Sequence, residues 1–519
     1  MYVTKRKGSI AVDKIFNTPY YYSMKKNIFP AIAVALVVSI YALLSPSLFA
    51  QGISSDAEKS AKSRQYMDLI TSVFSFVQQN YVDEVDPEVL YAGALKGIMD
   101  SLGDQYTTYL DKTSMRSMND TTVGNFGGVG LSITKALEST PDKPAYVEVA
   151  SPIEDTPGWK AGIQSGDLLI EINGVKTSDI SMDEVLGMLR GKIGESVDVL
   201  VRRGKNMEFP VTLVRALIEV PTVKFDMIKE NSNNIGYLRI IEFTPQTPER
   251  VQQALDFFKK EKYKGLIIDL RNNPGGLITS VADVADKFID SGTIVSTKSR
   301  LKYESSVYTA SAKKTTMQKG LPIVVLINKG SASASEILSG ALKDNHLAYL
   351  VGERTYGKGS VQQVVPLPNS DGIKLTMARY YTPSDTNIDK VGIPPDLIVK
   401  MADLSEEEEK AYIELVKSSE IADYVEAHPD MTETHIAQYA KQLGYKYKLN
   451  QTYLRRLVRL EVYRTKTQPL YDLDFDVQLN EAIRIVNSSG FNALVKATKT
   501  LKELQEEAQK EAENAAEKK

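Results

Sequence analysis

The sequence lacks cysteine and is poor in tryptophan and histidine, with one tryptophan and three histidines among 519 residues. The absence of cysteine excludes disulfides, a thiol nucleophile and thiolate metal sites. A surplus of charge is also missing, because 63 basic and 66 acidic side chains leave a net charge of -3. No strong field of one sign is predicted, so nucleic acid is not an expected partner. The length exceeds what one core can fill and predicts three or four domains.

Charged side chains are absent from residues 28–50, a nearly uninterrupted apolar run that follows two lysines. A basic segment followed by an apolar one is the order of a secretory signal, and this run is also long enough to span a bilayer. Ala50 suits a signal cleavage site, but Leu48 is larger than the usual residue at that position, so a cleaved signal and a retained anchor both stay open. Met24 is an alternative start. Each arrangement predicts export of the rest of the chain to the periplasm or cell envelope, soluble or anchored by one helix.

A serine-rich turn connects a predicted buried strand to a predicted helix. The apolar, β-branched run of residues 323–327 breaks at residues 328–330, the turn follows at residues 331–335, and a helical pattern begins at Glu336. A hydroxyl at such a turn is held out of the packed layer, beside the unpaired N–H groups and the positive end of the helix dipole. These groups lie where an oxyanion would form, so the turn suits a nucleophile, although a serine at this position also serves as a helix cap.

A lysine between two glycines follows this turn, at Lys358. Burial disfavours the charged form of a lysine, and a neutral amine can act as the general base for a serine hydroxyl. The alternative interpretation of this segment is a surface turn. A triad of Ser333, His346 and Asp344 is a further alternative, but triad members usually come from different loops, so these last two residues are expected to end the helix instead.

Three runs together resemble the C-terminal processing, or tail-specific, protease family, the S41-type serine peptidases. They are GSASASEI at residues 330–337 with Asp344 after it, GERTYGKGSVQQ at residues 352–363, and DLRNNPGG at residues 269–276. The resemblance implies a set of site residues: Ser333 as nucleophile, Lys358 as general base, Gln362 as the residue that orients the lysine, the amides of Ala334 and of Gly276 or Gly275 as the oxyanion hole, and Asp344 as structural support. It implies no metal and no cofactor.

Residues 123–214 read as a small β-rich module. A glycine turn enters an alternating strand at residues 127–133, and a turn, strand and turn follow at residues 158–174. Both segments resemble a PDZ domain, in which a ligand peptide adds a strand to a sheet edge and glycine-loop amides hold its terminal carboxylate. The implied loop amides are those of Gly128, Val129, Gly130 and Leu131. The helix at residues 182–189 would form the other wall of the groove, and the alternative is a module that only spaces domains.

The fold class predicted from these patterns is multidomain α/β, or α+β. Strands and helices alternate between residues 216 and 400, and the resemblance implies that this core is of the ClpP and crotonase-like type found in S41 peptidases. In chain order, we expect residues 1–50 as tail and signal or anchor, 51–118 as a helical segment, 119–215 as the PDZ domain, 216–400 as the peptidase core, and 401–519 as a helical region with a charged tail.

The expected function is that of an exported serine endopeptidase that cleaves proteins recruited through their C-terminal tails. A rival is a PDZ scaffold whose peptidase core is inactive or gated by a partner. A second rival, an ester hydrolase, is disfavoured because Ser333 lies in no Gly-x-Ser-x-Gly elbow. Besides polypeptide tails, the partners left open are an adaptor or activating ligand, a membrane if the N-terminal segment is retained, and a second copy of the chain.

Overall fold

The computed structural model describes residues 46–123, 125–136, 144–153, 155–204, 207–230, 233–400, 404–463 and 469–517. The chain divides into two compact units, residues 1–95 and residues 96–519. The first unit consists of helix α2 (Pro46–Asn80) and most of helix α3 (Pro87–Asp100). Within the described ranges, no helix is both long and apolar enough to cross a membrane. Most of the apolar run expected as a signal or anchor lies in residues 1–45, outside the described part.

The second unit contains a mixed six-stranded sheet in the order β10-β11-β12-β15-β16-β19. Only the pair β10 and β11 is antiparallel, and the other neighbours run parallel. Its strands are β10 (Val223–Glu230), β11 (Asn233–Ile240), β12 (Gly265–Asp269), β15 (Ile323–Ile327), β16 (Tyr349–Gly352) and β19 (Leu397–Ile398). The central strands β12 and β15 are buried at every position, because helices cover both faces of the sheet.

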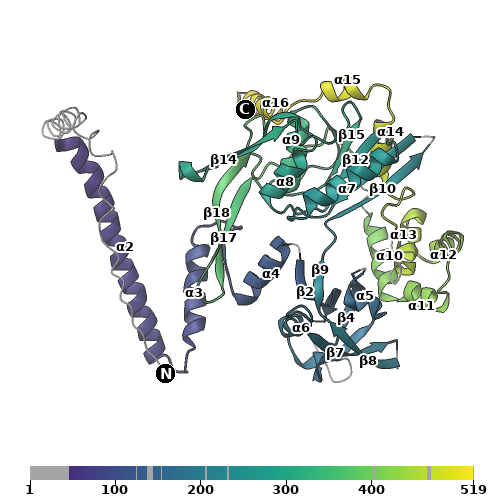
Figure 1. Ribbon diagram of the computed structural model, residues 1–519, viewed down its shortest axis with the longest axis horizontal. Coiled ribbons are helices and arrows are strands. Elements are labelled where there is room, and N and C mark those ends of the chain that lie inside the picture. The colour runs from purple at the N-terminus through teal and green to yellow at the C-terminus, as the bar shows by residue number, and fades with distance from the viewer. Residues whose placement is uncertain are drawn as a thin grey trace, which may run out of the picture. The chain divides into compact units, whose positions relative to one another are not determined.

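Three helices pack on one face of this sheet, as Figure 1 shows: α7 (Thr247–Lys260), α8 (Ile278–Ala285) and α9 (Ala334–Asp344). Helix α14 (Val477–Val486) covers the other face, where Leu479 and Ile483 join a second core with strands β12 and β15. Alternating residues of one buried strand enter the two cores, Val325 with the first and Val324 with the second. The predicted α/β class is confirmed by this layered arrangement.

A second sheet lies beside the first in the order β1-β18-β13-β14, with β17 paired to β18. Its strands are β1 (Thr108–Leu110), β13 (Ser291–Ser299), β14 (Ser306–Ser311), β17 (Ser360–Pro366) and β18 (Gly372–Tyr381). Thr108 of β1 pairs with Lys374 of β18. This pairing brings the segment before β1 to the same sheet as β17. The loop before β17, residues 353–359, contains Lys358 and is called the lysine loop below; it is far in sequence from β1.

The β-rich module begins after helix α4 (Lys112–Val123) and forms a sheet in the order β3-β4-β5-β7-β8, with β6 paired to β5. Its elements are β3 (Leu131–Lys135), β4 (Val147–Pro152), α5 (Pro157–Lys160), β5 (Leu168–Ile172), β6 (Val175–Lys176), α6 (Met182–Leu189), β7 (Ser196–Arg203) and β8 (Met207–Val214). The pair β2 (Asn125–Gly128) and β9 (Ala216–Glu219) joins the two ends of the module. Strand β3 lies at the edge of the sheet.

The C-terminal region has two parts. Helices α10 (Glu406–Lys417), α11 (Glu420–Ala427), α12 (Glu433–Lys446) and α13 (Gln451–Val462) enclose a separate core. Helices α14 and α15 (Phe491–Lys496) pack on the main sheet, and α16 (Leu501–Glu517) begins with Leu501 buried beside α9. Residues 401–519 were expected as one helical region, but the periodicity of a helix does not tell which surface it covers.

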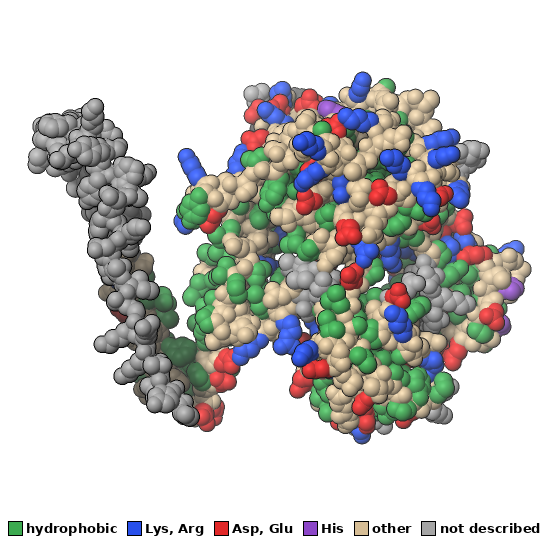
Figure 2. Space-filling view, viewed as in Figure 1, with side chains coloured by type: hydrophobic (Ala, Val, Ile, Leu, Met, Phe, Trp, Pro, Cys, Tyr) green, Lys and Arg blue, Asp and Glu red, His purple; other side chains and the backbone are tan. Residues whose placement is uncertain are grey.

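Acidic and basic side chains are interspersed over the face drawn in Figure 2. This pattern agrees with the small net charge of the sequence.

Candidate active site

Ser333 occupies the turn between β15 and α9, at the N-cap position of the helix. Its backbone has φ 54° and ψ -114°, a sparsely populated conformation for a residue with a side chain, and its hydroxyl makes no capping hydrogen bond. The strain persists because surrounding contacts fix the turn. The half-buried hydroxyl is thereby available for chemistry instead of for the helix.

The flanking serines hold the turn to the loop that follows β12. The Ser331 hydroxyl donates to the Leu270 carbonyl at 2.8 Å, and the Ser335 hydroxyl donates to the Asn273 carbonyl at 2.9 Å. The Ala332 amide donates to the same Asn273 carbonyl at 3.0 Å. Two of the three serines in the turn are therefore structural, because each donates its hydroxyl proton to a backbone carbonyl.

Glu336 connects the serine turn to the lysine loop. Its fully buried carboxylate accepts four hydrogen bonds, from the Ser333 amide at 2.9 Å, the Thr355 hydroxyl at 2.5 Å, the Gly357 amide at 2.7 Å and the Lys358 amide at 2.9 Å. Burial raises the pKa of Glu336, while the four donors favour its charged form. One oxygen, Oε2, binds the backbone of both Ser333 and Lys358, so this carboxylate fixes the two loops relative to each other.

The Lys358 side chain is half-buried, with its ammonium 5.1 Å from the centre of the Tyr106 ring. Desolvation lowers the pKa of Lys358, and the positive charge of Lys374 lowers it further, against opposing effects of Glu336 and Asp104. Burial and a hydrogen bond with Tyr356 raise the pKa of Tyr106 to about 12, so this phenol stays neutral beside the lysine. The surroundings favour the uncharged amine.

Two backbone N–H groups near Ser333 have no acceptor among the described residues, those of Gly276 and Ala334. The N–H of Gly275, in contrast, donates to the Asn273 side chain at 2.9 Å. A Cβ added at Gly275 would approach the Ala334 nitrogen to 2.9 Å and the Ser333 Cβ to 2.8 Å. The turn at Gly275 and Gly276 therefore lies directly against the serine, and only a residue without a side chain fits at Gly275.

Gln362 lies on β17, two residues after Ser360. Its side-chain amide donates to the Ser360 hydroxyl at 2.9 Å and to the Thr376 hydroxyl at 3.1 Å. Its described hydrogen bonds do not include one to Lys358, so its part in orienting the lysine stays a prediction.

Asp344 and His346 lie at the other end of α9 from Ser333. A helix of 11 residues is about 16 Å long, which separates these two side chains from the serine. Asp344 accepts from the Ser384 amide at 3.1 Å and from the Leu501 amide at 2.8 Å, and His346 contacts Thr498 at 3.2 Å. A triad of the three residues is therefore excluded, and Asp344 supports the structure instead.

Three residues of this site were given no catalytic part by the sequence interpretation: Glu336, Asp104 and Tyr106. The sequence predicts a helix beginning at Glu336, and the other two residues fall in the segment of residues 51–118 that is predicted as helical. A sequence signal existed for Glu336, because a glutamate three residues after a serine is the pattern of a capping box. No local pattern reveals that Tyr106 covers Lys358, since the two residues are more than two hundred positions apart.

The predicted carboxylate-binding loop lies between β2 and β3. Gly130 has φ 73°, and its carbonyl accepts from the Ile153 amide at 2.8 Å, while the Val129 carbonyl accepts from the Gly158 amide at 2.8 Å. The helix predicted over residues 182–189 is α6, whose Val185 and Leu189 share a core with residues of β3. A loop, an edge strand and a helix are thus adjacent, as the peptide groove of a PDZ domain requires.

Comparison with known families gives three matches along the chain. Residues 234–399 match peptidase family S41, residues 148–203 match a PDZ domain, and residues 38–114 match the N-terminal domain of the activating protease CtpB. The S41 match contains the serine turn at residues 331–335, the loop that carries Lys358, and the run of residues 269–276.

Known relatives cover most of the chain. A carboxy-terminal-processing protease of Bartonella bacilliformis is 36% identical over 71% of this chain and 82% of its own length. The carboxy-terminal processing protease CtpA of Bacillus subtilis is 31% identical over 78% of this chain and 83% of its own length. Among solved structures, the photosystem II D1 C-terminal processing protease is 28% identical, covering 64% of this chain and 92% of that one, with a TM-score of 0.39.

Proposed function

Because this chain belongs to the carboxy-terminal processing proteases of peptidase family S41 and is a serine peptidase, we propose that Lys358 activates Ser333 to cleave peptide bonds. The observation that carries this proposal is the Glu336 carboxylate, whose Oε2 binds the amides of both residues at 2.9 Å. A buried group that fixes two loops in this way keeps a nucleophile and its base in one geometry.

The proton follows a closed route in this mechanism. The neutral Lys358 amine takes the proton of the Ser333 hydroxyl as its oxygen bonds to the substrate carbonyl carbon. When the C–N bond breaks, the resulting ammonium gives its proton to the leaving amine. In the second half of the reaction, the neutral Lys358 amine takes a proton from water as the water oxygen bonds to the acyl carbon, and it gives this proton to the Ser333 oxygen when the ester C–O bond breaks.

The N–H groups of Gly276 and Ala334 are the proposed oxyanion hole, because both lack an acceptor among the described residues. Gly275 is the weaker candidate, since its N–H already donates to Asn273. Donors of this kind stabilise the charge that develops on the carbonyl oxygen in the transition state. Gln362 is proposed to orient the lysine, and its bonds to Ser360 and Thr376 fix the amide that would do so.

The activity of Lys358 as a base gives a prediction for the pH–rate profile. The pKa of this lysine is lowered from 10.5, so kcat should rise with pH through a midpoint below 10.5 as the amine loses its proton, and then level off. Tyr106 does not contribute to this limb, because its pKa is about 12. Single-turnover cleavage at a series of pH values measures the midpoint. A profile that is flat up to pH 10 would contradict the assignment.

Substrates are proposed to enter through their C-terminal tails, as additional strands on the open edge of β3. This edge strand lies beside the loop Gly128 to Leu131 and helix α6, which supplies the apolar wall. We also propose the domain boundaries predicted from the sequence, and export of the chain to the cell envelope. An activating ligand or adaptor acting on the PDZ domain is part of the same proposal.

Recruitment through the tail is tested with one unfolded protein carrying different C-termini. We expect the kcat/KM to fall about tenfold or more when an apolar tail is replaced by two aspartates or is amidated, because the groove holds both an apolar side chain and a carboxylate. The loss should appear in KM, with kcat unchanged. Equal rates for all three tails would contradict recruitment by the PDZ domain, and binding without cleavage would favour the scaffold hypothesis.

A further inference from the structure

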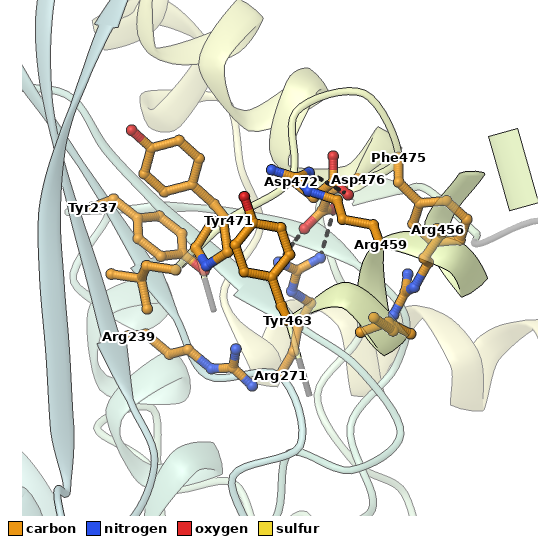
Figure 3. A pocket seen from close by; sticks show the side chains of 13 residues that line it. Tyr237, Arg239, Arg271, Arg456, Arg459, Tyr463, Tyr471, Asp472, Phe475 and Asp476 are labelled. Atoms are coloured by element: carbon orange, nitrogen blue, oxygen red, sulfur yellow. Dashed lines mark hydrogen bonds and ion pairs between the residues drawn. The ribbon is translucent and has the colours of Figure 1, made fainter. Parts of the chain in front are cut away.

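Two adjoining pockets lie between the main sheet and helix α13, outside the site described above. Their volumes are about 170 Å³ and 230 Å³, and they share Arg239, Arg271, Arg456 and Asp476. Arg239 and Asp269 are register partners at the ends of β11 and β12, whereas Arg456 comes from α13. Figure 3 shows side chains from the sheet and from α13 converging on the first pocket.

The arginines of these pockets differ in their partners. Arg271 pairs with Asp269 and Asp476, in each case at 2.6 Å, and Arg459 pairs with Asp472 at 2.7 Å. Arg239 and Arg456 pair with no carboxylate in the part of the chain that the structure describes. Arg459 also pairs with Glu433 at 2.9 Å, so Arg239 and Arg456 are the two arginines of these pockets whose charge no described ion pair compensates.

Arg456 lies over the Phe475 ring, with its guanidinium carbon 3.9 Å from the ring centre. A guanidinium stacked on an aromatic face keeps the N–H groups at its edge free to bind an oxyanion in a bidentate manner. Tyr463, Leu470 and Tyr471 add apolar surface to the same pocket. The pocket therefore has guanidinium groups and an apolar wall next to them.

We propose that this pocket binds the C-terminal residue of a polypeptide, with its carboxylate on Arg239 and Arg456 and its side chain against the aromatic wall. A free phosphate would use the charge but not the apolar surface, so a carboxylate attached to an apolar side chain fits the lining better. The identity of the ligand rests on the proposed function, because a protease that acts on C-terminal tails meets and produces such carboxylates. The site is separate from the PDZ groove, which has no arginine in its carboxylate loop.

The pocket is connected directly to the serine turn. Arg271 lines both pockets and the next residue, Asn272, lines the second, where the Asn272 amide donates to the Asn328 side chain at 2.9 Å. Asn328 in turn accepts from the Gly330 amide at 3.0 Å, just before the nucleophile. A polypeptide terminus in the pocket would therefore contact the loop that supports Ser333.

The test measures binding of a fluorescein-labelled hexapeptide that ends in leucine, with either a free carboxylate or an amide. The full chain carries Ser333→Ala so that no peptide is cleaved. In the parent we expect two sites per chain that bind the peptide through its carboxylate. In the double variant Arg239→Gln with Arg456→Gln, the affinity of the arginine site should fall at least tenfold, so that one site remains. The pair Arg239→Lys with Arg456→Lys should recover part of the binding, since it keeps the charge but not the bidentate geometry.

Arg300→Gln is the matched control, because this exposed arginine lies in the turn after β13, outside both pockets. It should leave both sites intact. One site in the parent and in the double variant would overturn the proposal while leaving recruitment by the PDZ domain standing. Loss of all carboxylate-dependent binding in the parent would overturn both. Displacement of the peptide from the second site by about 10 mM inorganic phosphate, at constant ionic strength, would show a general anion site and also overturn the proposal.

Discussion

Replacing Ser333 with alanine is expected to lower kcat/KM for an unfolded protein substrate by about 10⁵-fold or more. The variant loses the only hydroxyl of the turn that is free to attack, since those of Ser331 and Ser335 donate to backbone carbonyls. Lys358→Ala should cost nearly as much, because a serine without its base is a weak nucleophile. The double variant should be no slower than either single variant, since the two residues act as one unit. Cleavage is followed by gel electrophoresis and by release of labelled fragments.

Ser339→Ala and Lys329→Ala are the matched controls for these variants. The Ser339 hydroxyl bonds within α9, to the Ser335 carbonyl at 2.8 Å, and Lys329 is an exposed partner of Glu353. Both controls should keep near-normal activity and a thermal unfolding midpoint close to that of the parent. Cleavage by Lys358→Ala above about one hundredth of the parent rate, with Ser333→Ala inactive, would show that another group is the base.

The fold around the nucleophile could be predicted because its signals are local. A continuous apolar run that ends just before Asn328 and Gly330 specifies the buried strand β15. The helical pattern after this turn specifies α9. The apolar run of residues 349–352 likewise predicts a short strand, and β16 has these bounds. The apolar pattern of residues 277–289 predicts a helix, but α8 is shorter and ends at Ala285, with Asp286 as its C-cap. A pattern of apolar residues continues through that turn, because Phe288 and Ile289 also enter the core.

Contacts between distant segments could not be predicted in this way. Tyr106 reaches Lys358 because β1 pairs with β18, and no spacing within residues 103–110 indicates that pairing. Helix α14 was expected in a separate helical region, yet it covers the rear face of the main sheet, with Gln478 donating to the Val399 carbonyl at 2.7 Å. An amphipathic pattern predicts that one face of a helix is buried, but it does not identify the surface that covers this face. The two pockets between the main sheet and α13 also form through packing between segments that are distant in sequence.

Glu336→Gln is expected to lower kcat by about 100-fold, with a small change in KM. A carboxylate accepts two donors at each oxygen, and Glu336 uses all four positions. The amide nitrogen of glutamine is itself a donor, so one pair of donors loses its acceptor. Each buried donor left without a partner costs about 1–3 kcal/mol, and the loss falls on the geometry that joins Ser333 to Lys358.

The pH–rate profile separates this positioning effect from a general loss of stability. The negative charge of Glu336 raises the pKa of Lys358, so its removal should move the midpoint of the profile to lower pH, while a merely destabilised protein would keep the parent midpoint. Glu353→Gln is the matched control, since this carboxylate lies near the same loop and contacts only Lys329, at 3.7 Å, among the described ion pairs. It should change neither kcat nor the midpoint. If Glu336→Gln keeps the parent kcat and midpoint while folded, the two loops are held together by other contacts, and the carboxylate has no part in positioning the lysine.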